Sequence, residues 1–503
     1  MVSESTEFKG GAEAKESAAA FGDRVRSAVI WRSGSQILAQ LVTWSVTLVV
    51  IRLLDPADYG LFAMTQVIMS FLAFLNGWGF ASALVQSDSV DPFRIRQAFG
   101  LLLLLNGLLA GLQLAGAPLA AAYYGQPMVA DLLRVQALIY LATPFIALPE
   151  VMMSRTLDFR RQALVNLVAA LAGAGTALGC ALAGLGVWTL VYAPIALFWT
   201  RAIGLTIVAR LLVWPSFNFK GCGQIVGFGS AVLFSQLFWL VQTQSDVFIA
   251  GRRFEPHALG LYAEALFLAQ IFMAKFVPPL NEVAFPAYSR IKDDPAAMRW
   301  SFLKTVRLLM LVAAPFYCGL AVTAAPMVET LFGAKWLGMV PYIQILSLAL
   351  IFMTVQILFA PVNNALGRPL ITMVSSLGGA ILFPAGFLIG AEWGLIGIAW
   401  AWLVTAPLLL LLSARLTAPR LGLSLWQIAR AMLPGLAPAL VMAVGVGLAD
   451  QELLAPLGLA APIRLALLVA LGALLYGALL WLLEREAISE VMRLVLRREA
   501  SST

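Results

Sequence analysis

The chain of 503 residues contains few charged residues, few cysteines and one histidine. Charged residues make up 12% of the sequence, whereas soluble domains contain roughly 25%. The three cysteines, Cys180, Cys222 and Cys318, are widely separated, which argues against a disulfide framework and against a Cys-x-x-Cys metal site. A histidine-based metal centre is not expected either, because His257 is the single histidine. The sequence therefore excludes an ordinary soluble protein and indicates neither a metal nor a cofactor.

Apolar residues make up 61% of the chain and fall into segments of about 20 residues. A helix of that length crosses a hydrocarbon core of about 30 Å. The alternating pattern of a membrane barrel is missing, so the spans are expected to be helical. The sequence predicts an all-α polytopic membrane protein with about 14 transmembrane helices. We place them at about 33–51, 59–85, 97–122, 132–153, 163–183, 187–209, 225–250, 259–284, 303–325, 341–363, 370–390, 394–414, 431–449 and 461–483.

The distribution of Lys and Arg predicts which side of the membrane each loop faces. Short loops rich in these residues stay cytoplasmic. Most of the 33 Lys and Arg residues fall in the two terminal tails and in alternate loops. Both termini are therefore expected to be cytoplasmic.

Five parts follow from this arrangement. Residues 1–32 are expected to form a disordered, basic N-terminal tail. Residues 484–503 form either an amphipathic helix on the cytoplasmic leaflet or a solvated continuation of the last span. The remaining parts are an N-terminal six-helix lobe at 33–215, a C-terminal six-helix lobe at 216–415, and helices 13 and 14 at 416–483.

One polar hairpin occurs twice in the chain. The stretch Arg52–Ala63 matches Arg252–Ala263 at its Arg, acid-Pro and Gly-Leu-aromatic-Ala positions, 200 residues later. The same offset pairs Ser35-Gln36 with Ser235-Gln236. Because six spans separate the copies, both enter the membrane in the same direction. They are expected to be related by a pseudo-twofold axis along the membrane normal, as in transporters built from parallel repeats.

Four motifs give the chain a resemblance to a known family. They are the Arg52–Ala63 hairpin, Arg155–Arg160, Leu331–Trp336 and Ala365–Arg368. In this order and spacing they resemble the polysaccharide transporter (Wzx-like oligosaccharide flippase) family. Its superfamily also contains multidrug and toxin extruders and the lipid II flippase.

The resemblance implies two six-helix lobes around a central cavity that opens alternately to each side of a bacterial inner membrane. It implies a flippase rather than an enzyme, moving undecaprenyl-diphosphate-linked oligosaccharide from the cytoplasmic to the outer leaflet for lipopolysaccharide or exopolysaccharide biosynthesis. The implied partners are this lipid-linked substrate, membrane lipids, a polysaccharide polymerase and other assembly proteins, and no nucleic acid.

Charged residues inside the predicted spans are the first candidates for a site, because they are costly there and usually face a cavity. Lys275 either contacts the diphosphate of the substrate or forms a buried ion pair with a carboxylate such as Asp246. Glu264 shares a helix face with Lys275. Arg201 either faces the cavity or extends towards the cytoplasm.

Arginines and amides beside the repeated hairpins complete the candidate site. Arg52, Arg252 and Arg253 are candidates for binding phosphate, since arginine recognises phosphate oxygens in a planar, bidentate way; helix-end capping is the alternative. Gln36 and Gln236 are candidates for binding sugar hydroxyl groups, and hydrogen bonding between helices is the alternative.

Two other functions compete with the flippase. An ion-coupled multidrug and toxin extrusion antiporter has the same architecture, although the first span lacks the carboxylate that commonly binds its coupling ion. A sugar polymerase or glycosyltransferase needs a carboxylate cluster or a sizeable domain outside the membrane. The longest outer loop, at about 326–340, contains only Glu329 and Lys335 as charged residues.

Overall fold

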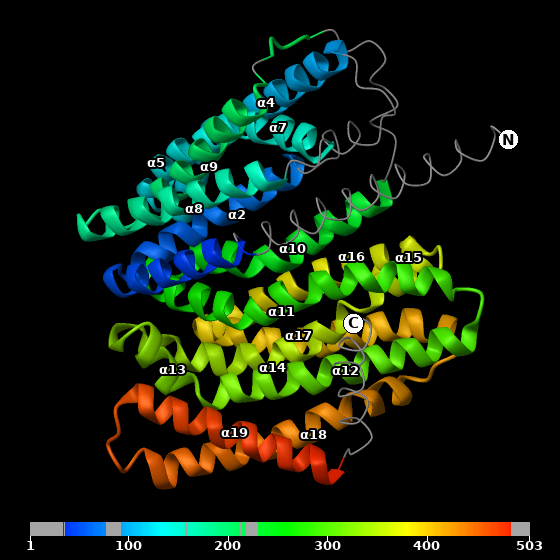
Figure 1. The fold of residues 1–503 in the computed structure, drawn as a ribbon. Helices are drawn as coiled ribbons and strands as arrows, with labels where there is room; N and C mark the ends of the chain where they lie inside the picture. The colour runs from blue at the N-terminus through cyan, green and yellow to red at the C-terminus, as the bar shows by residue number, and fades with distance from the viewer. Residues whose placement is uncertain are drawn as a thin grey trace, which may run out of the picture. The chain divides into compact units, whose positions relative to one another are not determined.

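A computed structural model describes residues 34, 36–76, 92–155, 159–211, 213–217 and 230–483. Within these ranges the chain is almost entirely helical and has no strand (Figure 1), which confirms the predicted all-α class. The predicted tails at 1–32 and 484–503 lie outside the described residues.

The chain divides into two compact units. One comprises the described residues of Met1–Asp55 and Ile68–Phe228, and the other those of Pro56–Val67 and Gly229–Thr503. The first unit contains a helix over Gln36–Leu53, the part of α2 (Pro56–Asn76) from Ile68 onwards, α4 (Pro92–Tyr124), α5 (Pro127–Gln136), α6 (Leu138–Ala142), α7 (Pro144–Arg155), α8 (Phe159–Leu182) and α9 (Trp188–Ala209).

The second unit contains the first turns of α2 and all later helices. These are α10 (Ser230–Arg253), α11 (Pro256–Arg290), α12 (Pro295–Val322), α13 (Ala324–Leu331), η2 (Ala334–Met339), α14 (Val340–Gln356), α15 (Phe359–Ala365), α16 (Pro369–Gly390), η3 (Ala391–Trp393), α17 (Gly394–Leu421), α18 (Leu425–Ala449), η4 (Asp450–Leu454) and α19 (Ala461–Leu483). The predicted domain boundaries remain a prediction.

Twelve stretches of the described chain are long and apolar enough to cross a membrane. One of them, Pro369–Leu421, contains two successive helices, α16 and α17, joined by η3. Helix α10 is not among the twelve, since three glutamines and Asp246 lower its apolar character. Counting α10 and the second helix of Pro369–Leu421 gives the 14 helices expected from the sequence.

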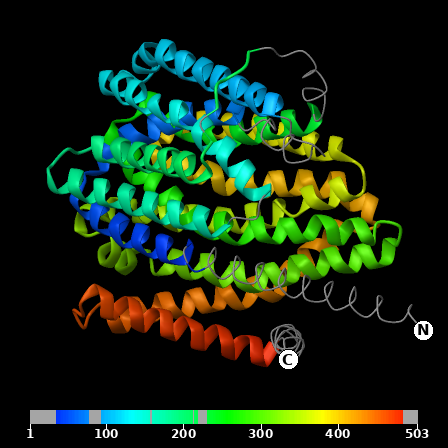
Figure 2. The same ribbon diagram turned by 45° about the horizontal axis from the view of Figure 1, so that its top comes forward.

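The last two helices form a hairpin within the second unit. Helix α18 begins at a capping box, in which Ser424 and Gln427 satisfy each other's backbone N–H groups. It packs along α12 and α19, and α18 and α19 lie side by side in Figure 1 and again in Figure 2. The hydroxyl of Tyr476 on α19 donates to the Leu311 carbonyl of α12 at 2.9 Å. Helices 13 and 14 are therefore packed onto the C-terminal helices.

The two repeated hairpins contact each other at their glycines. In each hairpin a helix begins at a proline, Pro56 for α2 and Pro256 for α11. These prolines and the two glycines, Gly60 and Gly260, all belong to the second unit. A Cβ added to Gly60 would lie 1.8 Å from the Pro256 carbonyl oxygen, and one added to Gly260 would lie 1.8 Å from that of Pro56. The contact is thus reciprocal, as expected for two copies related by a local twofold axis, and only glycine permits so close an approach.

A third sequence motif, Leu331–Trp336, and the residues directly after it pack on the two hairpins. Tyr59 of the first hairpin makes an edge-to-face contact with Trp336, with ring centroids 5.3 Å apart. Leu261 of the second hairpin lies so close to Gly338 that a Cβ there would be 2.8 Å from its Cδ1. Trp336 is fully buried. The motif Leu331–Trp336 therefore has a packing role against the first hairpin in the second unit, and Gly338, two residues after the motif, packs against the second hairpin.

We predict that Gly60→Ala and Gly260→Ala each destabilise the protein by about 1–3 kcal/mol, because each methyl group meets a backbone carbonyl that cannot move alone. The double variant should lose less than the sum of the two, since one separation of the helices relieves both clashes. Melting temperatures in detergent at one scan rate measure this. Gly111→Ala in α4, where nothing lies within 4 Å, is the control and should not destabilise. A Gly60→Ala variant as stable as this control contradicts the structure.

Candidate functional site

The candidate site is centred on α11, which places charged side chains along one face of a long apolar helix. Lys275 and Glu282 are exposed, and Glu264 is half-buried. Lys275 lies three turns after Glu264, about 16 Å along the helix axis, and Glu282 lies two turns after Lys275. The three side chains therefore share one face of the helix. Lys275 makes no ion pair or hydrogen bond within the part of the chain that the structure describes. An exposed ammonium group on such a helix can attract an anion.

Asp246 has a different environment from Lys275. Its side chain is fully buried. The Tyr262 hydroxyl donates to its Oδ2 at 2.8 Å, the Trp402 Nε1–H donates to the same oxygen at 3.2 Å, and the Val247 N–H donates to Oδ1 at 2.7 Å. The Trp402 Nε1–H also approaches the Tyr262 hydroxyl at 3.0 Å. The structure therefore does not pair Asp246 with Lys275; three donors from α10, α11 and α17 compensate its burial.

Aromatic packing holds the Trp402 ring in this network. Phe383 lies edge-on to Trp402 with centroids 4.9 Å apart, and Phe387 lies at 5.5 Å. All three side chains are at most 1% exposed. Asp246 thus anchors α10 in the core of the second unit.

The arginines of the second hairpin lie exposed in the last turn of α10. Arg253 Nη1 is 2.5 Å from Glu392 Oε1, and the two side chains are 41% and 67% exposed. Glu392 is in η3, so this pair joins the end of α10 to the turn between α16 and α17. Arg52 is exposed at the end of the Gln36–Leu53 helix in the first unit. Sequence reasoning missed Glu392, because it is far from Arg253 in the chain.

Arg201 forms an ion pair in the first unit. Its guanidinium contacts Glu150 on α7, and Gln162 also donates to Glu150 at 3.0 Å. Each side chain of the ion pair is 28% exposed. The sequence analysis considered neither this partner nor Glu150 itself, although Glu150 is a carboxylate within the predicted span 132–153.

The two predicted amides, Gln36 and Gln236, are exposed on their helices. Other polar side chains link helices within the second unit: the Gln356 amide donates to Ser413 at 3.2 Å, and the Asn363 amide to Thr417 at 3.1 Å. These two hydrogen bonds between helices are made by residues that the sequence analysis did not select. The roles of Gln36 and Gln236 in binding sugar remain predictions.

A family model described as "Polysaccharide biosynthesis protein" matches residues 49–341, more than half of the chain. The chain belongs to this family. The match includes both copies of the hairpin and α10 to η2, and so contains Asp246, Arg253 and Lys275, whereas Glu392 and Trp402 lie beyond it. It confirms the resemblance that the sequence motifs indicate.

Two relatives are similar over most of their length. The chain is 24% identical over 481 residues to the succinoglycan biosynthesis transport protein ExoT of Rhizobium meliloti (strain 1021), covering 93% of this chain and 95% of ExoT. It is 24% identical over 432 residues to the teichuronic acid biosynthesis protein TuaB of Bacillus subtilis (strain 168), covering 82% and 85%. Both are named for polysaccharide biosynthesis.

The fold resembles a solved structure of the lipid II flippase MurJ in an inward closed conformation. The TM-score is 0.69, and the match covers 91% of this chain and 100% of that one at 13% sequence identity. At this identity the likeness concerns the fold alone. Family and fold together indicate a multi-pass membrane transporter rather than a catalytic enzyme.

We predict that Asp246→Ala destabilises the protein by about 1–3 kcal/mol, because Tyr262 and Trp402 then lose their acceptor in the core. Asp246→Asn should cost less, since its amide oxygen can still accept a bond from one of them. Thermal unfolding of the purified variants measures the difference. Asp293→Ala is the matched control, as Asp293 is exposed. Equal melting temperatures for Asp246→Ala and Asp293→Ala contradict a structural role for the network.

Proposed function

We propose that this protein is a flippase that moves undecaprenyl-diphosphate-linked oligosaccharide from the cytoplasmic to the outer leaflet of a bacterial inner membrane, with both termini in the cytoplasm. Alternating access by two lobes is the proposed mechanism, and lipopolysaccharide or exopolysaccharide biosynthesis is the proposed pathway. A polymerase and other assembly proteins are the proposed partners. Membership of a polysaccharide biosynthesis family and a transporter fold support this proposal.

The observation that supports the proposal most directly is the exposed ammonium group of Lys275 within a membrane-spanning helix. A cation at such depth is costly unless it has a partner or a function. Within the described residues it has no partner, and its counterpart Asp246 is occupied by Tyr262 and Trp402. A diphosphate passing along α11 would supply the missing negative charge. Glu264 and Glu282 on the same face would then contact the sugar hydroxyls.

The arginines at the hairpins are further phosphate contacts in the proposal. Arg52, Arg252 and Arg253 lie at helix ends, where a phosphate leaving the membrane would meet guanidinium groups. Arg201 contributes less directly, because Glu150 already neutralises it. An inside-negative potential would favour outward movement of an anionic head group by about 2.3 kcal/mol per charge for each 100 mV, if the charge crosses the whole field.

An ion-coupled extruder remains the second candidate, since it has the same architecture. The two functions differ in what accumulates when the protein is missing. A deletion strain should accumulate lipid-linked oligosaccharide on the cytoplasmic leaflet if the protein is the flippase. Raised drug sensitivity without such accumulation supports the extruder.

We predict that Lys275→Ala slows flipping of the lipid-linked substrate by on the order of tenfold in reconstituted vesicles, because one charge-assisted contact is lost. Lys275→Arg should retain most of the rate, since it keeps the positive charge. Flipping is measured by the accessibility of the sugar to an impermeant lectin. Lys292→Ala is the control, because Lys292 is exposed in the turn between α11 and α12. Wild-type rates for Lys275→Ala across a range of membrane potentials overturn the role of Lys275.

A further inference from the structure

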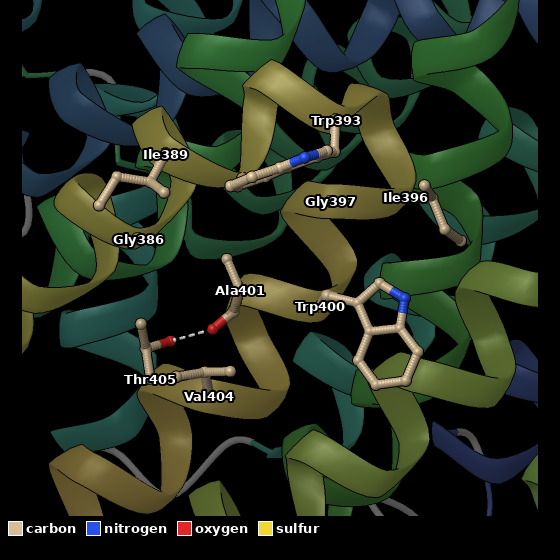
Figure 3. Close-up of a pocket in the computed structure, with 10 residues that line it drawn as sticks. Gly386, Ile389, Trp393, Ile396, Gly397, Trp400, Ala401, Val404 and Thr405 are labelled. Carbon is tan, nitrogen blue, oxygen red and sulfur yellow. Dashed lines mark hydrogen bonds between the residues drawn. The ribbon is translucent and has the colours of Figure 1, made fainter.

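An apolar groove of about 410 Å³ follows the hairpin of α16 and α17 in the second unit. Its lining includes Gly386, Gly390, Trp393, Gly397, Trp400 and Val404. Figure 3 shows the Trp393 ring across one end and the Trp400 ring along one side, with Ile389 on the opposite side. The two indoles are 70% and 53% exposed. Large aromatic surfaces thus border an open groove.

The glycines explain the shape of the groove. A Cβ on Gly390 would lie 2.4 Å from the Gly397 carbonyl oxygen, and one on Gly397 would lie 2.0 Å from that of Gly390. The two helices therefore cross with their backbones in contact, and no side chain fills the surface above the crossing. The hydroxyl of Thr405 donates to the Ala401 carbonyl at 2.7 Å, as drawn in Figure 3. The groove consequently offers hydrocarbon surface and few polar groups.

The groove has the length of one membrane leaflet. From Trp393 to Thr405 the rise is about 18 Å at 1.5 Å per residue. Half of a hydrocarbon core of about 30 Å is similar. Trp393 is at the end of the hairpin, where tryptophan favours the membrane interface. A lipid chain lying in the groove would therefore have its head group beside Trp393.

An exposed ion pair lies at that end. Glu392, the residue before Trp393, is 2.5 Å from Arg253 Nη1. Arginine has five N–H donors, and the Arg253 side chain is 41% exposed, so its guanidinium can also receive a phosphate oxygen. An apolar channel with an exposed arginine at its interfacial end is complementary to an amphiphile with a phosphorylated head group.

We propose that this groove binds the polyisoprenoid chain of the carrier lipid, with its diphosphate at Arg253. The inference rests on the proposed function and adds to it a binding site for the carrier, separate from Lys275. A single chain fits one groove between two helices, whereas a two-chain phospholipid places only half of its tail there.

The test uses the full-length protein in nanodiscs with undecaprenyl diphosphate bearing a diazirine in its chain. Val404→Trp fills the groove, and Leu408→Trp, one turn further along the same face of α17 and outside the groove, is the matched control. Photolabel should map to Trp393 and Trp400 in the wild type. Binding should weaken on the order of tenfold in Val404→Trp and remain unchanged in Leu408→Trp.

A second variant tests the head-group end. Arg253→Gln should weaken binding of undecaprenyl diphosphate and leave binding of the uncharged isoprenoid alcohol unchanged. Glu392 is 67% exposed, so losing its partner should not disturb the fold. Equal loss for both ligands overturns the assignment of the diphosphate to Arg253.

Three results would overturn the groove as the carrier site. They are equal displacement of the photolabel by phosphatidylglycerol, which indicates ordinary lipid; label transfer between two copies through the groove, which indicates an interface; and unchanged binding in Val404→Trp. A parallel flipping assay separates the two proposals. Normal flipping without groove labelling contradicts only the groove, and groove labelling without flipping contradicts only the proposed function.

Discussion

The reciprocal contact of Gly60 with Gly260 is the constraint on which the second unit depends. Two helix N-termini cross at a distance that excludes any Cβ atom, and each glycine lies against the carbonyl of the other hairpin's proline. Tyr59, the residue before Gly60, packs edge-to-face against Trp336. Because the crossing fixes where α11 begins, it also fixes the face on which Lys275 lies. The positions of the charged residues therefore follow from a steric requirement of the backbone.

The scarcity of charge makes the environment of each charged side chain informative. Asp246 is stabilised by a phenol, an indole and a backbone amide rather than by a cation, so its burial needs no counter-ion. Lys275 has no such arrangement within the described chain. Asp246 and Lys275, on the two helices of one hairpin, thus have different environments. Asp246 is buried and hydrogen-bonded, and Lys275 is exposed. The sequence offers Lys275 as a partner for Asp246, but donors from α10, α11 and α17 satisfy the carboxylate instead.

Much of the fold could be predicted because it depends on local properties. Apolar length predicts the helices, and the offset of 200 residues identifies the repeat. The partners could not be predicted, because they depend on which helices meet. Glu392 is separated from Arg253 by seven helical elements, and no local pattern marks it as a partner. Glu150 could have been found, since it is a carboxylate inside a predicted span. The matching of Trp402 to Asp246 needed the packing of α17 against α10.

The groove and the glycine crossing are linked by the chain itself. Only Phe254 and Glu255 separate Arg253 from Pro256, the first residue of α11 and one side of the crossing. Arg253 in turn is tied to η3 at the end of the groove. The short connection between α10 and α11 therefore lies between two contacts. The ion pair of Arg253 with Glu392 is on one side, and the backbone contact of Pro256 with Gly60 is on the other. A head group bound at Arg253 would therefore contact the same turn that leads into the glycine crossing.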